Sequence, residues 1–296
     1  MERATLDAAL ASLAAQTYAK GEVIVVNAKG GQHRDFGGSV GCFALRIVNQ
    51  GGVSLSRPQA ANAGLDAAQG QYLAFLDDDD TLDPDHLSAL VVALQAQSGV
   101  VVAYAGVRCI DRGDPEQKIS RIFGAPLESF AQLLAGNFIP IHAPLFPRQL
   151  IKLARFDEGL ETYEDWDFWL QLAQHAKFFY TGQVTATYYT GGSSGVSPQA
   201  PDWDAVRLAL RALYAKWFRL APDEFKKICD LYHRTAADLQ SSREQTTQLD
   251  AQLAQTRTQL DSMQMRLQEL LSSRSWVLTQ PLRQLKKLAI KFLRSG

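Results

Sequence analysis

The sequence has 296 residues, of which 46% are hydrophobic and 21% are charged, a composition typical of a globular protein with a substantial core. The formal net charge of -1 argues against general nucleic-acid binding. The three cysteines are widely spaced and match no metal-ligand pattern, so we expect reduced thiols in a cytosolic protein. The opening MERATLDAAL lacks the basic and apolar regions of a signal peptide, so none is expected.

The first part of the chain alternates helix and strand patterns. Leu6, Leu10, Leu13 and Ala14 recur at helical spacing and predict a helix, and the apolar runs EVIVV and FALRIV predict strands on either side of a glycine-rich polar segment. RPQAANAGLDAAQG then predicts a helix, and residues 71–76 predict a strand that leads into four consecutive aspartates. A helix capped by Asp83 and the strand VVVAYAGV follow. This alternation predicts an α/β fold with a mostly parallel, doubly wound sheet.

Shorter elements continue toward residue 195. We expect a helix ending near Ala135, an apolar loop or strand in NFIPIHAPLFP, a short helix near 149–153 and a stronger helix over 163–177. FFYTG and VTATYY are strand-like. Two helices, at 203–219 and 223–235, are separated at Ala221-Pro222. The predicted domains are therefore 1–195, a catalytic-type α/β domain, and 196–235, a helical extension.

The remaining residues change character. Residues 236–275 carry apolar or small side chains at 3-4 heptad spacing, which predicts a coiled coil and a homo-oligomer. A single amphipathic helix folded back on the first domain is the alternative. Residues 276–296 form a basic amphipathic tail in which leucines lie opposite lysines and arginines. This pattern is typical of a helix on an anionic membrane surface, although it also fits a basic tail that aids solubility or pairs with the acidic domain.

The four aspartates of YLAFLDDDDTLDPD follow a predicted strand directly. In open α/β sheets, ligands lie beyond the carboxyl ends of strands, and carboxylate oxygens suit Mg²⁺ or Mn²⁺. Alternate carboxylates, Asp77 and Asp79, are expected to face one point, while Asp78 and Asp80 point away. A calcium EF-hand is excluded, because Leu82 would occupy the position that requires glycine. The alternative is a solvated loop whose aspartates cap the next helix.

Several motifs resemble those of a known family. Four segments are SLAAQTY, EVIVV, RPQAANAGLDAAQGQYLAFLDDDD and FDEGLETYEDWDFWLQLA. Their order and spacing resemble those of the family-2 inverting glycosyltransferases of A-type fold, particularly bacterial enzymes that build surface polysaccharides. The resemblance spans residues 4 to about 195. It implies that Asp79 binds a divalent metal and that Asp77 reaches the donor ribose or the metal. It also implies that Arg57, Asn62 and Asn27 lie near the nucleotide.

The resemblance further implies a catalytic pair, Glu164 and Asp165, in which Asp165 takes the proton from the acceptor hydroxyl. The alternative is that both residues only stabilise a helix start through its dipole, which would lower their pKa. His142 and Trp166 would contact the acceptor. A hydrogen-bonded structural histidine and a core tryptophan are the respective alternatives.

Two features depart from the family pattern. Its members begin with a central strand and a nucleotide-gripping turn, whereas this sequence begins just after that point, so we expect a gap inside the sheet and either a truncated or a degenerate protein. Asn27 also stands where the family usually has an aspartate.

The resemblance implies metal-dependent sugar transfer, with inversion, from a nucleotide-sugar to a glycan or lipid-linked acceptor, at the cytoplasmic face of the cell membrane. Two alternatives stay open. A truncated transferase domain could act as a non-catalytic scaffold through its coiled coil. FLDDDDTL also fits the motif of haloacid-dehalogenase-like phosphatases, in which Asp77 would be the nucleophile.

Overall fold

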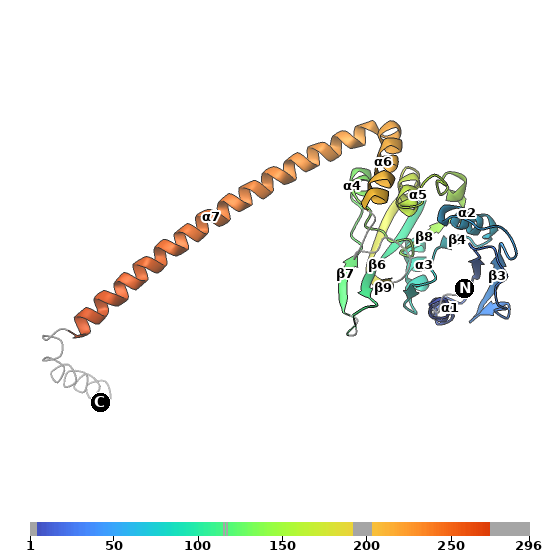
Figure 1. Cartoon of the computed structure of the whole chain (residues 1–296), viewed down its shortest axis with the longest axis horizontal. Coiled ribbons are helices and arrows are strands. Elements are labelled where there is room, and N and C mark those ends of the chain that lie inside the picture. Colours follow the sequence, from blue (N-terminus) through green and yellow to red (C-terminus); the bar gives the residue numbers. More distant parts are fainter. Residues whose placement is uncertain (1–4, 115, 117, 192–202, 273–296) are drawn as a thin grey trace, which may run out of the picture. The chain divides into compact units, whose positions relative to one another are not determined.

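The computed structural model describes residues 5–114, 116, 118–191 and 203–272, and Figure 1 shows the order of their elements along the chain. Contacts within the chain define two units, residues 1–228 and 229–296. None of the helices in these described ranges combines the length and the apolar character that crossing a bilayer would require.

A small sheet forms near the start of the chain. The apolar runs predicted as strands are β1 (Glu22–Val26) and β3 (Phe43–Val48), which pair in parallel, and β2 (Ser39–Val40) pairs antiparallel with β3. Helices α1 (Leu6–Ala14) and α2 (Arg57–Ala67) precede and follow these strands. Ser56 begins α2 with a capping box, because its hydroxyl accepts from the Gln59 N–H while the Gln59 side chain accepts from the Ser56 N–H.

The larger sheet has the order β4-β8-β6-β9-β5, with β7 paired to β6. Its strands are β4 (Tyr72–Ala74), β5 (Thr81–Leu82), β6 (Val101–Asp111), β7 (Ile119–Phe123), β8 (Pro144–Pro147) and β9 (Lys177–Thr190). Within this sheet β6 and β9 pair in parallel, and the other described pairs are antiparallel. The α/β class is thus confirmed, whereas the pairing is mixed rather than mostly parallel. The resemblance implied one sheet with a gap inside it. The structure instead has β1 and β4 in two different sheets.

Helices cover the larger sheet and complete the core. α3 (His86–Ala96) packs Leu90, Val91 and Leu94 against β6. α4 (Phe130–Ala135), a 3₁₀ turn (Arg148–Lys152), α5 (Glu164–Ala173) and α6 (Trp203–Leu220) supply much of the remainder. α5 and α6 lie side by side in Figure 1, and the indole N–H of Trp217 donates to Asp167 at 2.8 Å. Burial of these aromatic and aliphatic side chains is the main force that holds the unit together.

The helix boundaries near the end of the chain differ from the prediction. α6 ends at Leu220, and α7 (Pro222–Ser272) includes in its first turn the proline that was expected to separate the two helices. α7 then continues for 51 residues, so the boundary expected at 235 lies inside one helix. Residues 229–272 of α7 form the described part of the second unit. The basic tail, 276–296, lies outside the described residues.

Candidate active site

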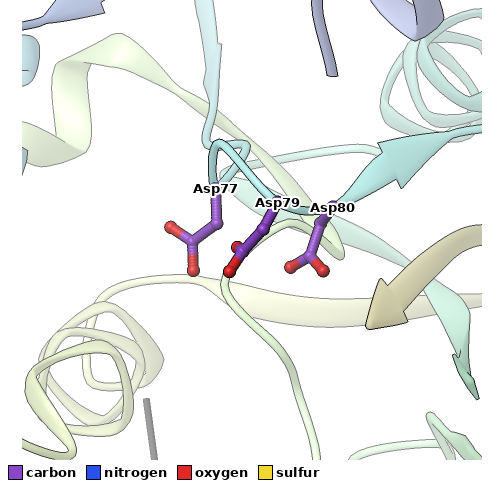
Figure 2. Close-up of side chains that lie close together, drawn as sticks. All are labelled: Asp77, Asp79 and Asp80. Atoms are coloured by element: carbon purple, nitrogen blue, oxygen red, sulfur yellow. The ribbon is translucent and has the colours of Figure 1, made fainter. Parts of the chain in front are cut away.

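The four aspartates follow β4, at the edge where that strand ends. Asp77, Asp79 and Asp80 each offer a carboxylate oxygen, and these oxygens lie within 4.8 Å of one another. Figure 2 shows the three side chains on the same side of the loop. A tight turn, in which the Asp80 N–H donates to the Asp77 carbonyl at 3.2 Å, brings them together. The expectation that Asp80 points away is therefore wrong: a turn, unlike an extended strand, does not alternate its side chains.

The cluster concentrates negative charge in a partly buried place. Desolvation, with repulsion from its neighbours, raises the pKa of Asp77 to about 6 even though Arg57 opposes the shift, and raises that of Asp80 to about 8. Asp80 is only 1% exposed, and its Oδ2 has no hydrogen-bond partner among the described residues. Hard oxygen donors with unmet charge fit Mg²⁺ or Mn²⁺, and a bound cation would lower these pKa values.

Arg57 connects this cluster to the second acidic pair. Its Nε donates to Oε1 of Glu164 at 2.8 Å, and its Nη2 lies 3.7 Å from Oδ2 of Asp77. The capping box of α2 fixes the backbone just before Arg57, so the guanidinium starts from a defined position. One arginine therefore contacts two carboxylates that are 87 residues apart (164 − 77) in the chain.

The second pair begins α5. Tyr163, just before the helix, has a positive φ of 65°, which turns the chain so that Glu164 is buried and Asp165 half-buried. One oxygen of Asp165 accepts from the Trp166 N–H at 2.7 Å and the other from Nδ2 of Asn137 at 3.2 Å. Desolvation and the charge of Glu164 nevertheless raise the pKa of Asp165 to about 7. Burial thus outweighs the lowering that the helix start alone would produce.

Both acidic groups line one cavity of about 1420 Å³. Its walls also include Asn27, Arg57 and residues of both β1 and β4. Polar residues in this lining that the sequence did not point to include Asn137, Tyr188 and Tyr189. No local pattern marks them, because loop and strand residues reach the cavity only through the tertiary fold.

The two asparagines expected near a nucleotide have different surroundings. Asn27 lines the cavity, and its side-chain amide donates to the Gly31 carbonyl. Asn62 is buried, and its amide exchanges two hydrogen bonds of 3.0 Å with the backbone of Phe156. Its amide N–H₂ and carbonyl thus tie α2 to a segment 94 residues later. The structure does not bring Asn62 to the acidic cluster.

The residues expected to contact an acceptor are buried. Trp166 is 3% exposed, and its indole N–H donates to the Leu133 carbonyl at 2.6 Å, as in the core alternative. His142 lines the cavity but is 1% exposed, and its Nδ1 lies 3.2 Å from Oδ2 of Asp80. Desolvation, with a smaller contribution from His86, lowers the pKa of His142 to about 3, so its imidazole is neutral at pH 7.

The α/β unit places a carboxylate cluster after a strand and a second acidic pair at a helix start on one cavity, which is the arrangement that the resemblance to A-type glycosyltransferases implies. Residues 47–153 match the family model "Glycosyl transferase family 2". This matched segment includes the whole acidic cluster, so the similarity to that family covers the aspartates.

Parts of the chain are similar to curated proteins and to a solved structure. The chain is 30% identical over 118 residues to an uncharacterized glycosyltransferase of Haemophilus influenzae, covering 40% of this chain and 45% of that protein. It is 32% identical over 122 residues to the succinoglycan biosynthesis protein ExoO of Rhizobium meliloti, covering 36% and 34%. The crystal structure of S. aureus TarS 1-349 superposes with a TM-score of 0.49 at 16% identity, covering 73% and 62%. The chain spans 18% to 45% of the length of the curated relatives it matches.

Proposed function

We propose that this protein transfers a sugar from a nucleotide-sugar donor to a hydroxyl group of a glycan or lipid-linked acceptor, with inversion at the anomeric carbon. The observation that carries the proposal is the contact of Arg57 with both Asp77 and Glu164. This contact places the acidic cluster and the Glu164-Asp165 pair on one cavity, as a displacement between a bound donor and an acceptor requires.

The cluster of Asp77, Asp79 and Asp80 would hold Mn²⁺ or Mg²⁺. When bound, the cation supplies positive charge that stabilises the departing nucleoside diphosphate. Asn27, on the same cavity, offers amide hydrogen bonds to the nucleotide. Arg57 adds a further positive charge near Asp77.

Asp165 is the proposed general base. Its carboxylate would take the proton of the acceptor hydroxyl as that oxygen attacks the anomeric carbon. A pKa of about 7 suits the role, because a general base works best when its pKa is near the working pH. The hydrogen bonds from Asn137 and from the Trp166 N–H fix the orientation of the carboxylate. One base is sufficient for a single displacement.

Calorimetry with UDP-, GDP- and dTDP-sugars, with and without Mn²⁺, tests the donor and the metal together. We expect metal-dependent binding of at least one donor, followed by NMR of the product to establish inversion. Absence of metal-dependent binding to every donor would contradict the proposal and favour the non-catalytic scaffold. Hydrolysis of p-nitrophenyl phosphate that is lost in Asp77→Asn would instead favour the phosphatase alternative.

The proposed setting is polysaccharide synthesis at the cytoplasmic face of the membrane. The name of the Rhizobium relative supports the pathway class, and the basic composition of residues 276–296 supports attraction to anionic lipid. Flotation with liposomes tests the second point. We expect more protein on vesicles containing anionic lipid than on neutral ones, and equal recovery would remove the electrostatic contribution.

A second proposed activity is self-association through α7. The apolar side chains at its heptad positions are exposed, including Leu239 (52%), Leu249 (64%), Leu253 (55%) and Leu260 (54%). A second copy of the helix would bury them as a coiled coil. Sedimentation of the full chain at several concentrations tests this, and a monomer at every concentration would contradict it.

A further inference from the structure

A buried histidine lies directly behind the acidic cluster. His142, in the loop before β8, and Asp80, in the loop before β5, are each 1% exposed. Nδ1 of His142 lies 3.2 Å from Oδ2 of Asp80. These two atoms are close enough for a hydrogen bond, but their angles do not meet the criteria for one. Oδ2 of Asp80 and both imidazole nitrogens of His142 therefore have no hydrogen-bond partner among the described residues. Burying these three polar atoms costs free energy unless they form hydrogen bonds with one another or bind a ligand.

The other contacts of this pair restrict what it can do. Oδ1 of Asp80 accepts from the Tyr189 N–H at 2.8 Å, so the carboxylate is held from β9. The ring of His142 stacks on Tyr188 of the same strand, with centroids 6.2 Å apart and planes inclined by 28°. Neither side chain has room to turn toward bulk solvent. The imidazole therefore faces Asp80 and, through it, the cavity that the cluster lines.

We propose that His142 is a positioning residue for the cation site, where it hydrogen-bonds Oδ2 of Asp80 and thereby holds Asp80 as a third carboxylate ligand beside Asp77 and Asp79. The inference rests on the metal-binding part of the proposed function. A carboxylate has about four lone-pair positions, so Asp80 can accept from Tyr189 and His142 and still offer an electron pair to a cation. Groups that hydrogen-bond a metal ligand typically contribute 10- to 100-fold to metal affinity.

This role differs from direct contact with a sugar and from packing alone. A sugar contact requires accessible imidazole nitrogens, whereas the His142 side chain is 0% exposed. A packing role requires only an aromatic ring on Tyr188, which phenylalanine also provides. A positioning role requires a polar group at the place of Nδ1, which the amide of asparagine provides and phenylalanine does not.

The test compares Mn²⁺ binding to the full chain without donor, followed by the electron paramagnetic resonance signal of free Mn²⁺. For His142→Phe we expect a Kd about 10- to 100-fold weaker than that of the unchanged protein, and for His142→Asn a Kd within about threefold. Asp80→Asn should weaken binding at least as much as His142→Phe. Adding His142→Phe to Asp80→Asn should have no further effect, because both changes act on one ligand.

His86 interacts with His142, so it provides a control for changes in this buried region that leave the contact between His142 and Asp80 in place. It is equally buried, and its Nδ1 contacts the Thr185 hydroxyl at 2.8 Å instead of a carboxylate. We expect His86→Asn to leave the Mn²⁺ affinity within about twofold. Equal Mn²⁺ affinity of His142→Phe and the unchanged protein, or additive effects of the two changes, would overturn the inference. Absence of Mn²⁺ binding to the unchanged protein would instead overturn the metal-binding part of the proposed function.

A second measurement does not depend on the variants folding. Mg²⁺ is titrated into the unchanged protein, and two-bond ¹H–¹⁵N spectra follow the imidazole nitrogens of His142. We expect the Nδ1 resonance to move in step with saturation, as its hydrogen bond to Asp80 becomes ordered. A resonance that stays in place while Mg²⁺ saturates the site would overturn the inference.

Discussion

The two units differ in the exposure of their leucine side chains. In residues 1–228, leucines such as Leu90 and Leu133 are fully buried, and several carboxylates line a cavity in which their pKa values rise. In the described part of the second unit, Leu249, Leu253 and Leu260 are more than half exposed on a single helix. Burying a leucine contributes about 1.5 to 3 kcal/mol. The first unit therefore buries a leucine-rich core, with Leu153 and Leu208 still more than half exposed, whereas the three α7 leucines would gain this free energy only by packing against another helix.

The proposed sugar transfer and the proposed self-association therefore rest on different features of this chain. In the first unit, the clustered carboxylates are unfavourable unless a bound cation compensates their charge. In α7, the exposed leucines are unfavourable in water, and a second helix would bury them. Changes at the acidic cavity should alter transfer without altering the oligomeric state. Changes on the seam of α7 should do the reverse.

The largest effect is expected for Asp165→Asn. The amide cannot take a proton, so the rate of transfer should fall by about 10²- to 10⁴-fold, the range that general-base catalysis contributes. Donor binding measured by calorimetry should stay close to that of the unchanged protein, and sedimentation should be the same. A loss of less than about tenfold would exclude Asp165 as the base.

Asp79→Asn removes one of the three clustered carboxylates. We expect Mn²⁺-dependent donor binding to weaken by about 100-fold, since a hard cation loses a charged ligand. Asp78→Asn is the control, because it removes a neighbouring charge outside the cluster. Similar losses in the two variants would show that the total charge matters and that the clustered oxygens do not.

Arg57 contacts both acidic groups, so changes at this position separate charge from geometry. Arg57→Lys keeps the charge but loses the planar fork, and we expect kcat/KM to fall about 10-fold, with about 100-fold for Arg57→Ala. Equal rates for the lysine variant and the unchanged protein would show that only the charge is needed. Neither variant should change self-association.

The pH profile examines the environment of Asp165. The deprotonated carboxylate is the active form, and its raised pKa means that kcat/KM should fall as the pH drops below about 7. Asn137→Ala removes a hydrogen bond that stabilises the carboxylate, so the acidic limb should move upward by about half a unit to one unit. If kcat/KM of the unchanged protein fell only near pH 4, the conclusion that burial raises the pKa of Asp165 would be contradicted.

The smallest effect on transfer is expected from the seam of α7. Leu253→Lys with Leu260→Lys places like charges where the helices would pack, so the proposed oligomer should dissociate while the transfer rate per chain stays within about twofold. Gln252→Lys with Gln259→Lys adds the same charge one residue away and should leave the assembly intact. Dissociation in both pairs would point to net charge instead of the seam.

Much of the fold follows from local pattern. The apolar runs at β1 and β3 and the helical pattern of α2 each act within a few residues, so the sequence predicts these elements with nearly the observed bounds, whereas it divides α7 at residue 235. The sequence predicts contacts less well when the interacting residues are far apart in the chain. Asp83 was expected to cap α3, but α3 begins at His86, and Asp83 instead pairs with both terminal nitrogens of Arg108, at 2.8 and 2.6 Å.

The sequence by itself determined the α/β class and the position of the aspartates after a strand, and its resemblance to family-2 transferases pointed to Glu164-Asp165 as a second acidic pair. These features depend on residue type and on spacing along the chain. Only the tertiary structure decided that Asp80 joins Asp77 and Asp79, that Arg57 spans two acidic groups and that Asn62 holds the backbone of Phe156. Each of these is a contact between distant segments, or a turn that reorients neighbours, and local periodicity carries no information about which distant groups meet.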